Sequence, residues 1–192
     1  MTTPTHLAQS KIAILVANGF EQMAFSAFQK SVIKMGAFPR IISNENGLVT
    51  GWMGSDWGHA YAVEQPLNKA LAVDFDMLFV PGGFRSHDKL RLTAHTKRFM
   101  NGFIGSAKPV YLCDDAVSLL VMCEKISTDN MKDTAAIYAT LREQGAQQIQ
   151  DGILQWNNVI CIDTAKVEDL DTFMEQMHNA VATQLVSVQN AA

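Results

Sequence analysis

The chain has 192 residues, of which 48% are hydrophobic and 18% charged, a composition that excludes a disordered tail protein and a collagen-like repeat. Basic residues number 15 against 19 acidic ones, for a net charge of -4, so there is no basic surplus for a phosphate backbone and we expect no nucleic acid partner. The apolar runs are too short to span a bilayer, the N-terminus lacks a signal-peptide pattern, and the three cysteines lack CxxC spacing, so we expect no membrane partner and a cytoplasmic location.

No linker or repeat divides the sequence, so we expect a flexible tail over residues 1–10 and a single domain over residues 11–188. Residues 11–17 read KIAILVA, a continuous apolar run that is typical of a parallel strand buried on both faces. A helical pattern follows over residues 20–35, and then a strand over residues 38–43. Together they predict a β-α-β unit.

The glycine-rich residues 44–63 predict small strands or a hairpin at an edge, outside the main sheet. Residues 76–80 predict a second buried strand. Residues 86–107 predict one long helix that begins at a serine and has Leu92 among its apolar positions. Residues 109–113 predict a further strand.

A helical pattern over residues 115–123 follows that strand without a loop, and another helix is expected over residues 134–144. Residues 153–163 predict a strand or a hairpin that turns at two asparagines, and residues 167–188 a final amphipathic helix. Alternating helices and buried parallel-type strands predict an α/β protein, a doubly wound three-layer sandwich.

Ligands of such folds lie beyond the carboxyl ends of the parallel strands. Three segments of this chain follow strand ends, at residues 18–21, 82–85 and 113–115. We therefore expect these segments to meet and to form a pocket.

Three sequences in these regions, KIAILVANGFEQ, DFDMLFVPGG and KPVYLCDDAVSLL, resemble in order and spacing the DJ-1/PfpI (ThiJ/PfpI) superfamily, from residue 11 to about residue 173. The resemblance implies a flavodoxin-like, mainly parallel sandwich related to class I glutamine amidotransferases, usually homodimeric. Stress proteins, glyoxalase-type enzymes and peptidase-like proteins belong to that family. The resemblance also implies a cysteine on a strand-to-helix elbow, with a glutamate from the first strand-helix loop beside it.

The chain departs from this pattern at the elbow. Matched without a gap, the nucleophile position falls on Asp114 and the next on Asp115, while the glutamate position falls on Ala24. A shift of one residue that makes Cys113 the nucleophile stays an alternative. It would place Asp115 in the crowded second position after the elbow, where the small Ala116 fits better.

The same match places Thr134 where the family commonly has histidine or tyrosine, and Asp163 near a common arginine. The candidates for the pocket are the residues at the three strand ends together with these two positions. They are Glu21, Gly82, Gly83, Arg85, Cys113, Asp114, Asp115, Thr134 and Asp163.

Two interpretations of Asp114 compete. As a structural residue it tolerates unusual backbone angles, and its carboxylate can accept N–H bonds from the first turn of the following helix. As a nucleophile it would use backbone N–H groups of Gly83 and Asp115 as an oxyanion cradle, and it would need a base. His87 is the only histidine expected near the pocket, and a solvated histidine at a helix start explains it as well.

A metal site is a third interpretation, because Asp114, Asp115 and Asp163 could converge with Glu21 around Mg²⁺ or Ca²⁺. Arg85, at the same rim, could instead neutralise these acids. We assign no metal and no cofactor.

For the cysteines and tryptophans we expect fewer alternative roles. Cys123 and Cys161 are expected to be buried small hydrophobic residues. Cys113, at a strand end, keeps the role of a redox sensor open. Trp52 and Trp57, in the glycine-rich segment, are candidates for an interface or a lid.

The sequence thus predicts a homodimeric DJ-1/PfpI-like pseudoenzyme without the usual cysteine and glutamate. Its predicted function is to bind a small molecule or to act as a stress-related interaction protein, and not as a thiol-dependent amidotransferase, peptidase or glyoxalase. The alternatives are a hydrolase or lyase that uses Asp114 or an aspartate-bound metal, and a redox sensor based on Cys113.

Overall fold

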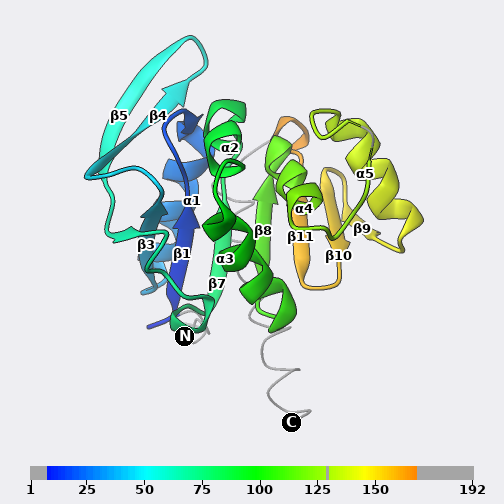
Figure 1. Ribbon diagram of the computed structural model, residues 1–192, viewed down its shortest axis with the longest axis horizontal. Coiled ribbons are helices and arrows are strands. Elements are labelled where there is room, and N and C mark those ends of the chain that lie inside the picture. The colour runs from blue at the N-terminus through cyan, green and yellow to red at the C-terminus, as the bar shows by residue number, and fades with distance from the viewer. Residues whose placement is uncertain (1–7, 129, 168–192) are drawn as a thin grey trace, which may run out of the picture.

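The computed structural model describes residues 8–128 and 130–167, and a mixed sheet of eight strands runs through this part of the chain (Figure 1). The strand order is β6-β3-β1-β7-β8-β11-β10-β9, in which the pairs from β6 to β11 are parallel and the last two are antiparallel. The strands are β1 (Lys11–Leu15), β3 (Phe38–Ser43), β6 (Gln65–Pro66), β7 (Met77–Val80), β8 (Val110–Cys113), β9 (Gln147–Gln150), β10 (Ile153–Trp156) and β11 (Val159–Ile162).

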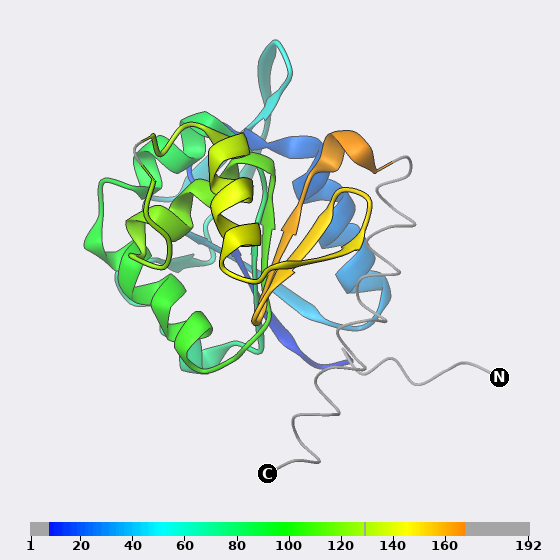
Figure 2. The same ribbon diagram turned by 90° about the vertical axis from the view of Figure 1, so that its right-hand side faces the viewer.

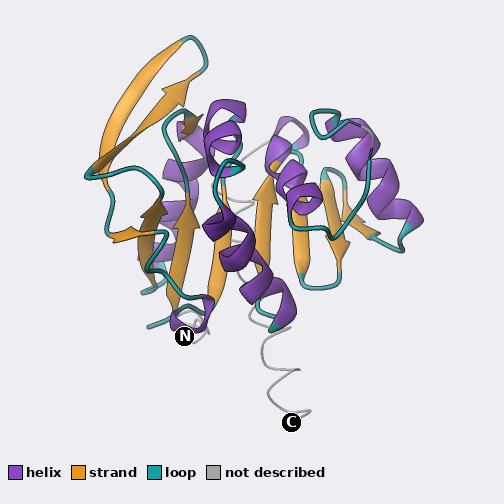
Figure 3. Ribbon diagram, in the orientation of Figure 1, coloured by secondary structure: helices purple, strands orange, loops and turns teal. Residues whose placement is uncertain are grey.

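Helices cover both faces of this sheet, as Figure 2 shows from the side. Helix α1 (Gln22–Lys34) packs on one face, and the other face carries α2 (Phe84–Leu90), α3 (Ala94–Gly105), α4 (Leu119–Met122) and α5 (Thr134–Glu143). Figure 3 shows the resulting helix, sheet and helix layers. The predicted three-layer, mainly parallel α/β sandwich is confirmed.

Strand β1 explains why the first apolar run of the sequence has no polar alternation. Ile12 and Ile14 belong to the apolar cluster under α1, whereas Ala13 and Leu15 belong to the cluster on the opposite face. All four side chains are fully buried. A strand with helices on both faces has no solvated side, so every residue of β1 after the exposed Lys11 is apolar.

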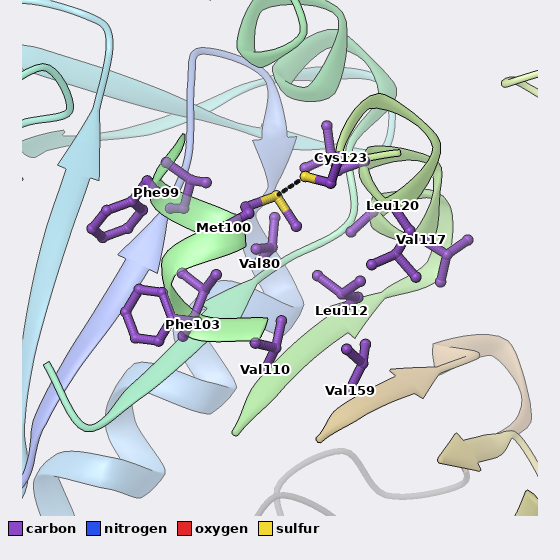
Figure 4. Packing of buried hydrophobic residues seen from close by; sticks show 14 of the residues in the cluster. Val80, Phe99, Met100, Phe103, Val110, Leu112, Val117, Leu120, Cys123 and Val159 are labelled. Atoms are coloured by element: carbon purple, nitrogen blue, oxygen red, sulfur yellow. Dashed lines mark hydrogen bonds between the residues drawn. The ribbon is translucent and has the colours of Figure 1, made fainter. Parts of the chain in front are cut away.

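The second cluster joins α3 and α4 to the sheet (Figure 4). Phe99, Met100 and Phe103 of α3 lie against the strands, and the Cys123 thiol approaches the Met100 sulfur at 3.9 Å. Cys123 is buried there as a small hydrophobic residue, as predicted.

The glycine-rich segment forms the predicted hairpin, which projects from one end of the molecule in Figure 1. Strand β4 (Leu48–Met53) lies between β5 (Asp56–Ala62) and the short β2 (Phe20–Glu21), and the three form a separate sheet. The rings of Trp52 and Trp57 meet edge to face on it, with centroids 5.4 Å apart.

The prediction of one helix over residues 86–107 is wrong, because α2 and α3 are separate. Thr93 has an extended backbone, and its hydroxyl accepts the N–H of His95, which caps α3 and stops α2 from continuing. The expected core residue Leu92 is 87% exposed in the break. Ser86 does not begin α2 either, because its buried hydroxyl accepts the N–H of Ala17.

Two further differences concern the second half of the chain. Asp114–Ser118 form a 3-10 turn, η2, before α4, and β9 was not expected. The hairpin of β10 and β11 is confirmed, with Asn157 at its turn. The predicted helix over residues 167–188 and most of the tail over residues 1–10 lie outside the described residues. Within the described part, no helix is long and apolar enough to cross a membrane.

The break between α2 and α3 can be tested by substitution. Thr93→Ala removes the cap of α3 and should lower the free energy of unfolding by about 1 kcal/mol. Leu92→Ala changes an exposed side chain and should alter it by less than about 0.5 kcal/mol. Urea unfolding of both variants measures this, and the reverse ranking would support one continuous helix.

Candidate functional site

The three strand-end segments meet as predicted. The N–H of Glu21 donates to the carbonyl oxygen of Gly82 at 2.7 Å, and the N–H of Gly83 donates to Oδ1 of Asp115 at 2.9 Å. Gly83 has a φ of 122°, and a Cβ there would lie 2.7 Å from the carbonyl oxygen of Gly19. Only glycine allows the segments to approach this closely.

Asp114 stands at the elbow, directly after β8, with a φ of 51°. This left-handed conformation is one that aspartate tolerates better than most residues. Oδ1 accepts the N–H of Thr164 at 2.8 Å and Oδ2 accepts its hydroxyl at 2.7 Å. The expected cap of the following helix is therefore wrong: the Asp114 carboxylate ties β8 to the segment after β11.

The environment of Asp114 disfavours its ionised form. Burial raises the pKa of the Asp114 carboxyl, and the charges of Asp115 and Asp163 raise it further. The two hydrogen bonds from Thr164 act in the opposite direction but do not outweigh burial. Asp114 is thus a buried carboxyl group that titrates above its ordinary range.

Asp115, the next residue, has a different environment. Its Oδ2 lies 2.8 Å from Nδ1 of His87, whose Nε2 lies 2.9 Å from the carbonyl oxygen of Pro81. Burial raises the pKa of Asp115, but the hydrogen bond and charge of His87 and the N–H of Gly83 outweigh it, and the net pKa is lowered. Asp115 is therefore an ionised carboxylate.

His87 is fully buried, so the prediction of a solvated histidine is wrong. A carbonyl oxygen only accepts, so Nε2 must carry a proton toward Pro81. Nδ1 faces the carboxylate of Asp115, so the ring of His87 joins Asp115 to the loop after β7.

Glu21 and Cys113 are held as structural groups. Both oxygens of Glu21 cap α1, accepting the N–H groups of Met23 at 2.8 Å and Ala24 at 2.6 Å. Cys113 is fully buried. Burial, together with the charges of Asp114 and Glu21, raises the pKa of its thiol well above the ordinary value, so Cys113 stays protonated.

Arg85 does not neutralise the acidic residues. Its guanidinium carbon lies 3.9 Å from the centroid of the Trp52 ring, and within the described residues it forms no ion pair. This stacking joins the beginning of α2 to the β4–β5 hairpin. Nor do the predicted acids form a metal site, because the described part of the chain contains no group of three or more histidine, cysteine or acidic side chains placed to hold an ion.

A cavity of about 660 Å³ opens beside the elbow, between η2, α5, β9, β10 and the segment after β11. Of the predicted residues, four line it, whereas the other five lie in the strand-end segments outside its lining. The lining consists of Asp114, Asp115, Thr134, Ala135, Tyr138, Arg142, Gln148, Asp151, Gly152, Ile153, Leu154, Asp163 and Lys166.

Sequence reasoning missed most of this lining. Tyr138 and Arg142 stand four residues apart on α5, a spacing that places them on one helix face, and this signal was available. Gln148 lies on β9, whose sequence QQIQ is exposed throughout and carries no strand pattern.

The comparison with known proteins agrees with this geometry. The family model described as "DJ-1/PfpI family" matches residues 10–180. The chain belongs to the DJ-1/PfpI family. It is 26% identical over 170 residues to the protein named "Putative cysteine protease YraA" of Bacillus subtilis (strain 168), covering 88% of this chain and 96% of that protein.

Solved structures share the family fold. A ThiJ/PfpI domain protein from Brachyspira murdochii superposes with a TM-score of 0.68 at 16% identity, covering 94% of this chain and 98% of that chain. A two-domain protein of Anabaena variabilis with DJ-1/ThiJ/PfpI-like and ferritin-like domains gives a TM-score of 0.66 at 20% identity. This chain is covered over 81% of its length but spans only 44% of that protein.

The pair of Asp115 and His87 leads to a prediction for stability. Asp115→Asn removes the carboxylate that contacts the buried His87 ring and accepts the Gly83 N–H, and it should lower the free energy of unfolding by about 3 kcal/mol at neutral pH. Because the pKa of Asp115 is lowered on folding, its contribution is present above the ordinary carboxyl value of 3.8 and is lost as pH falls through the folded value. The difference between variant and wild type should therefore shrink at acid pH.

Urea unfolding at several pH values measures this difference, and the exposed Asp151→Asn is the matched control, expected to leave stability unchanged. A loss of stability no larger than that of the control, or one that does not shrink at acid pH, would contradict the role of this pair.

Proposed function

We propose that this protein binds a small molecule in the cavity beside the elbow and does not perform the thiol chemistry expected of its family. One observation carries the proposal: the reactive groups at the elbow are committed to internal contacts, while the cavity next to them stays open. The cavity volume of about 660 Å³ lies within the range of small-molecule sites.

The contacts at the elbow argue against nucleophilic catalysis. A carboxylate nucleophile must move toward the atom that it attacks, whereas both oxygens of Asp114 are held in place by hydrogen bonds from Thr164. The Gly83 N–H that an oxyanion cradle would use already donates to Asp115. A hydrolase or lyase based on Asp114 would have to break these contacts before it could act.

The wall of the cavity has the mixture of groups that ligand sites commonly have. Ile153 and Leu154 present apolar surface, and both are almost fully buried. Tyr138, Arg142 and Thr134 add hydrogen-bonding groups from one helix. Apolar walls with a few polar groups give a ligand both affinity and a fixed orientation.

A cavity-filling variant tests this function. Ala135→Trp places a large side chain in the lining from an exposed position of α5, whereas Ala139→Trp adds the same side chain to an exposed position of that helix outside the lining. Thermal unfolding in the presence of a metabolite library should reveal compounds that stabilise the wild type and Ala139→Trp but not Ala135→Trp. Equal stabilisation of all three proteins, or of none, would contradict the proposal.

Thiol-dependent proteolysis is the second candidate, because the relative YraA is named a putative cysteine protease. It requires an exposed thiolate at the elbow, whereas Cys113 is buried and its pKa is raised. The same burial weakens the role of a redox sensor. The homodimer, the cytoplasmic location and a stress-related role stay predictions.

Alkylation distinguishes a buried, unreactive Cys113 from a reactive one. All three cysteines are buried, so native protein should react with iodoacetamide far more slowly than urea-unfolded protein, and Cys113 should not be modified first. Mass spectrometry of peptides after timed quenching measures this. Rapid and selective modification of Cys113 in the folded protein would favour the thiol enzyme or the sensor.

A further inference from the structure

Asp114 differs from Asp115 and Asp163 because no cation compensates its charge within the described residues. Asp115 is paired with the buried His87, and Asp163 lies 3.2 Å from Nζ of Lys166. Asp114 has only the N–H and hydroxyl of Thr164. A carboxylate has about four lone-pair sites, so the two hydrogen bonds from Thr164 leave acceptor capacity on Asp114, which lines the cavity.

Tyr138 adds an unsatisfied group to the same wall. Its hydroxyl oxygen is buried and has no hydrogen-bond partner within the described part of the chain, although the residue lines the cavity. Buried hydroxyl groups are normally hydrogen-bonded, and leaving one unpaired costs about 1–3 kcal/mol. Burial and the nearby charges, among them Asp114 and Asp163, raise the pKa of Tyr138, so it stays a neutral donor and acceptor.

Arg142 stands one helical turn beyond Tyr138, on the same face of α5 and also in the lining. Among the described residues its guanidinium group has neither an ion pair nor a hydrogen bond, unlike that of Arg91, which contacts Asp88 and Ser118. A guanidinium group binds carboxylates through two parallel hydrogen bonds. Its position suits an acidic group of a ligand.

We propose that the cavity binds a small zwitterion of the amino-acid type, with the ammonium group at Asp114 and Tyr138 and the carboxylate at Arg142. This inference rests on the proposed function, since it names the class of ligand for that cavity. An ammonium group has three N–H donors, which suits one uncompensated carboxylate and one tyrosine oxygen.

Ligands with a single charge fit the wall less well. An amine without an acid leaves Arg142 without a counter-ion. An acid without an amine brings a further negative charge to a cavity that already contains Asp114 and Asp151, and like charges at short distance repel. A zwitterion matches both ends without changing the net charge of the cavity.

Calorimetric titration of the full chain with each standard L-amino acid tests the proposal. For the tightest of them we expect binding at least about tenfold stronger than for its two matched analogues, the carboxylate without the amino group and the amine without the carboxylate. Amino acids that do not bind, or that bind no better than these analogues, would overturn the inference.

Two variants should separate the two ends of the ligand. Asp114→Asn should weaken the amino acid at least about tenfold and leave the carboxylate analogue unweakened, and Arg142→Gln should weaken the amino acid similarly and leave the amine analogue unchanged. Glu143→Gln, the next residue on α5 and outside the lining, is the control expected to bind as the wild type. Equal losses for all ligands in both variants would contradict the assigned orientation.

The result also separates the inference from the proposed function. If library compounds bind and Ala135→Trp blocks them while amino acids do not compete, the cavity is a small-molecule site and the zwitterion is wrong. If no compound depends on the cavity, both fail. Arg142→Gln alters an exposed side chain and keeps the test valid even if Asp114→Asn proves too unstable to study.

Discussion

The hydrogen-bonded chain from Gly83 through Asp115 to His87 holds the centre of this molecule together. The Asp115 carboxylate belongs to the turn after β8. It accepts the N–H of Gly83 in the loop after β7 and contacts Nδ1 of His87 in α2. Because His87 is fully buried, its two ring nitrogens depend on Asp115 and on the carbonyl oxygen of Pro81 as hydrogen-bond partners. Removing either partner would leave a charge or a polar group without compensation in a dry interior.

In contrast to the pair of Asp115 and His87, Asp114 has mainly a structural role at the elbow. It adopts a left-handed backbone at the elbow and ties the end of β8 to the segment after β11 through Thr164. The same arrangement leaves its negative charge uncompensated within the described residues. Asp114 thus becomes one wall of a cavity, at the place where the ammonium group of the proposed ligand would bind.

The two cysteines nearest this site show why a thiol at a strand end is not by itself reactive. Cys113 and Cys161 are fully buried in neighbouring strands, and burial raises the pKa of both thiols. Reactivity requires a thiolate that is stabilised and accessible. In this chain the left-handed turn position belongs to the next residue, Asp114.

Continuous apolar runs and their spacing determined the layers, the parallel core of the sheet and the meeting of the three strand ends, because a strand covered on both faces has a distinctive local pattern. The tertiary structure alone decided the rest. It buried His87 between Asp115 and Pro81, ended α2 at Leu90, and brought β9 and α5 around the elbow to form a cavity with Tyr138 and Arg142 in its wall. The contacts of a buried side chain and the enclosure of a cavity depend on groups that are distant in sequence, so no local pattern predicts them.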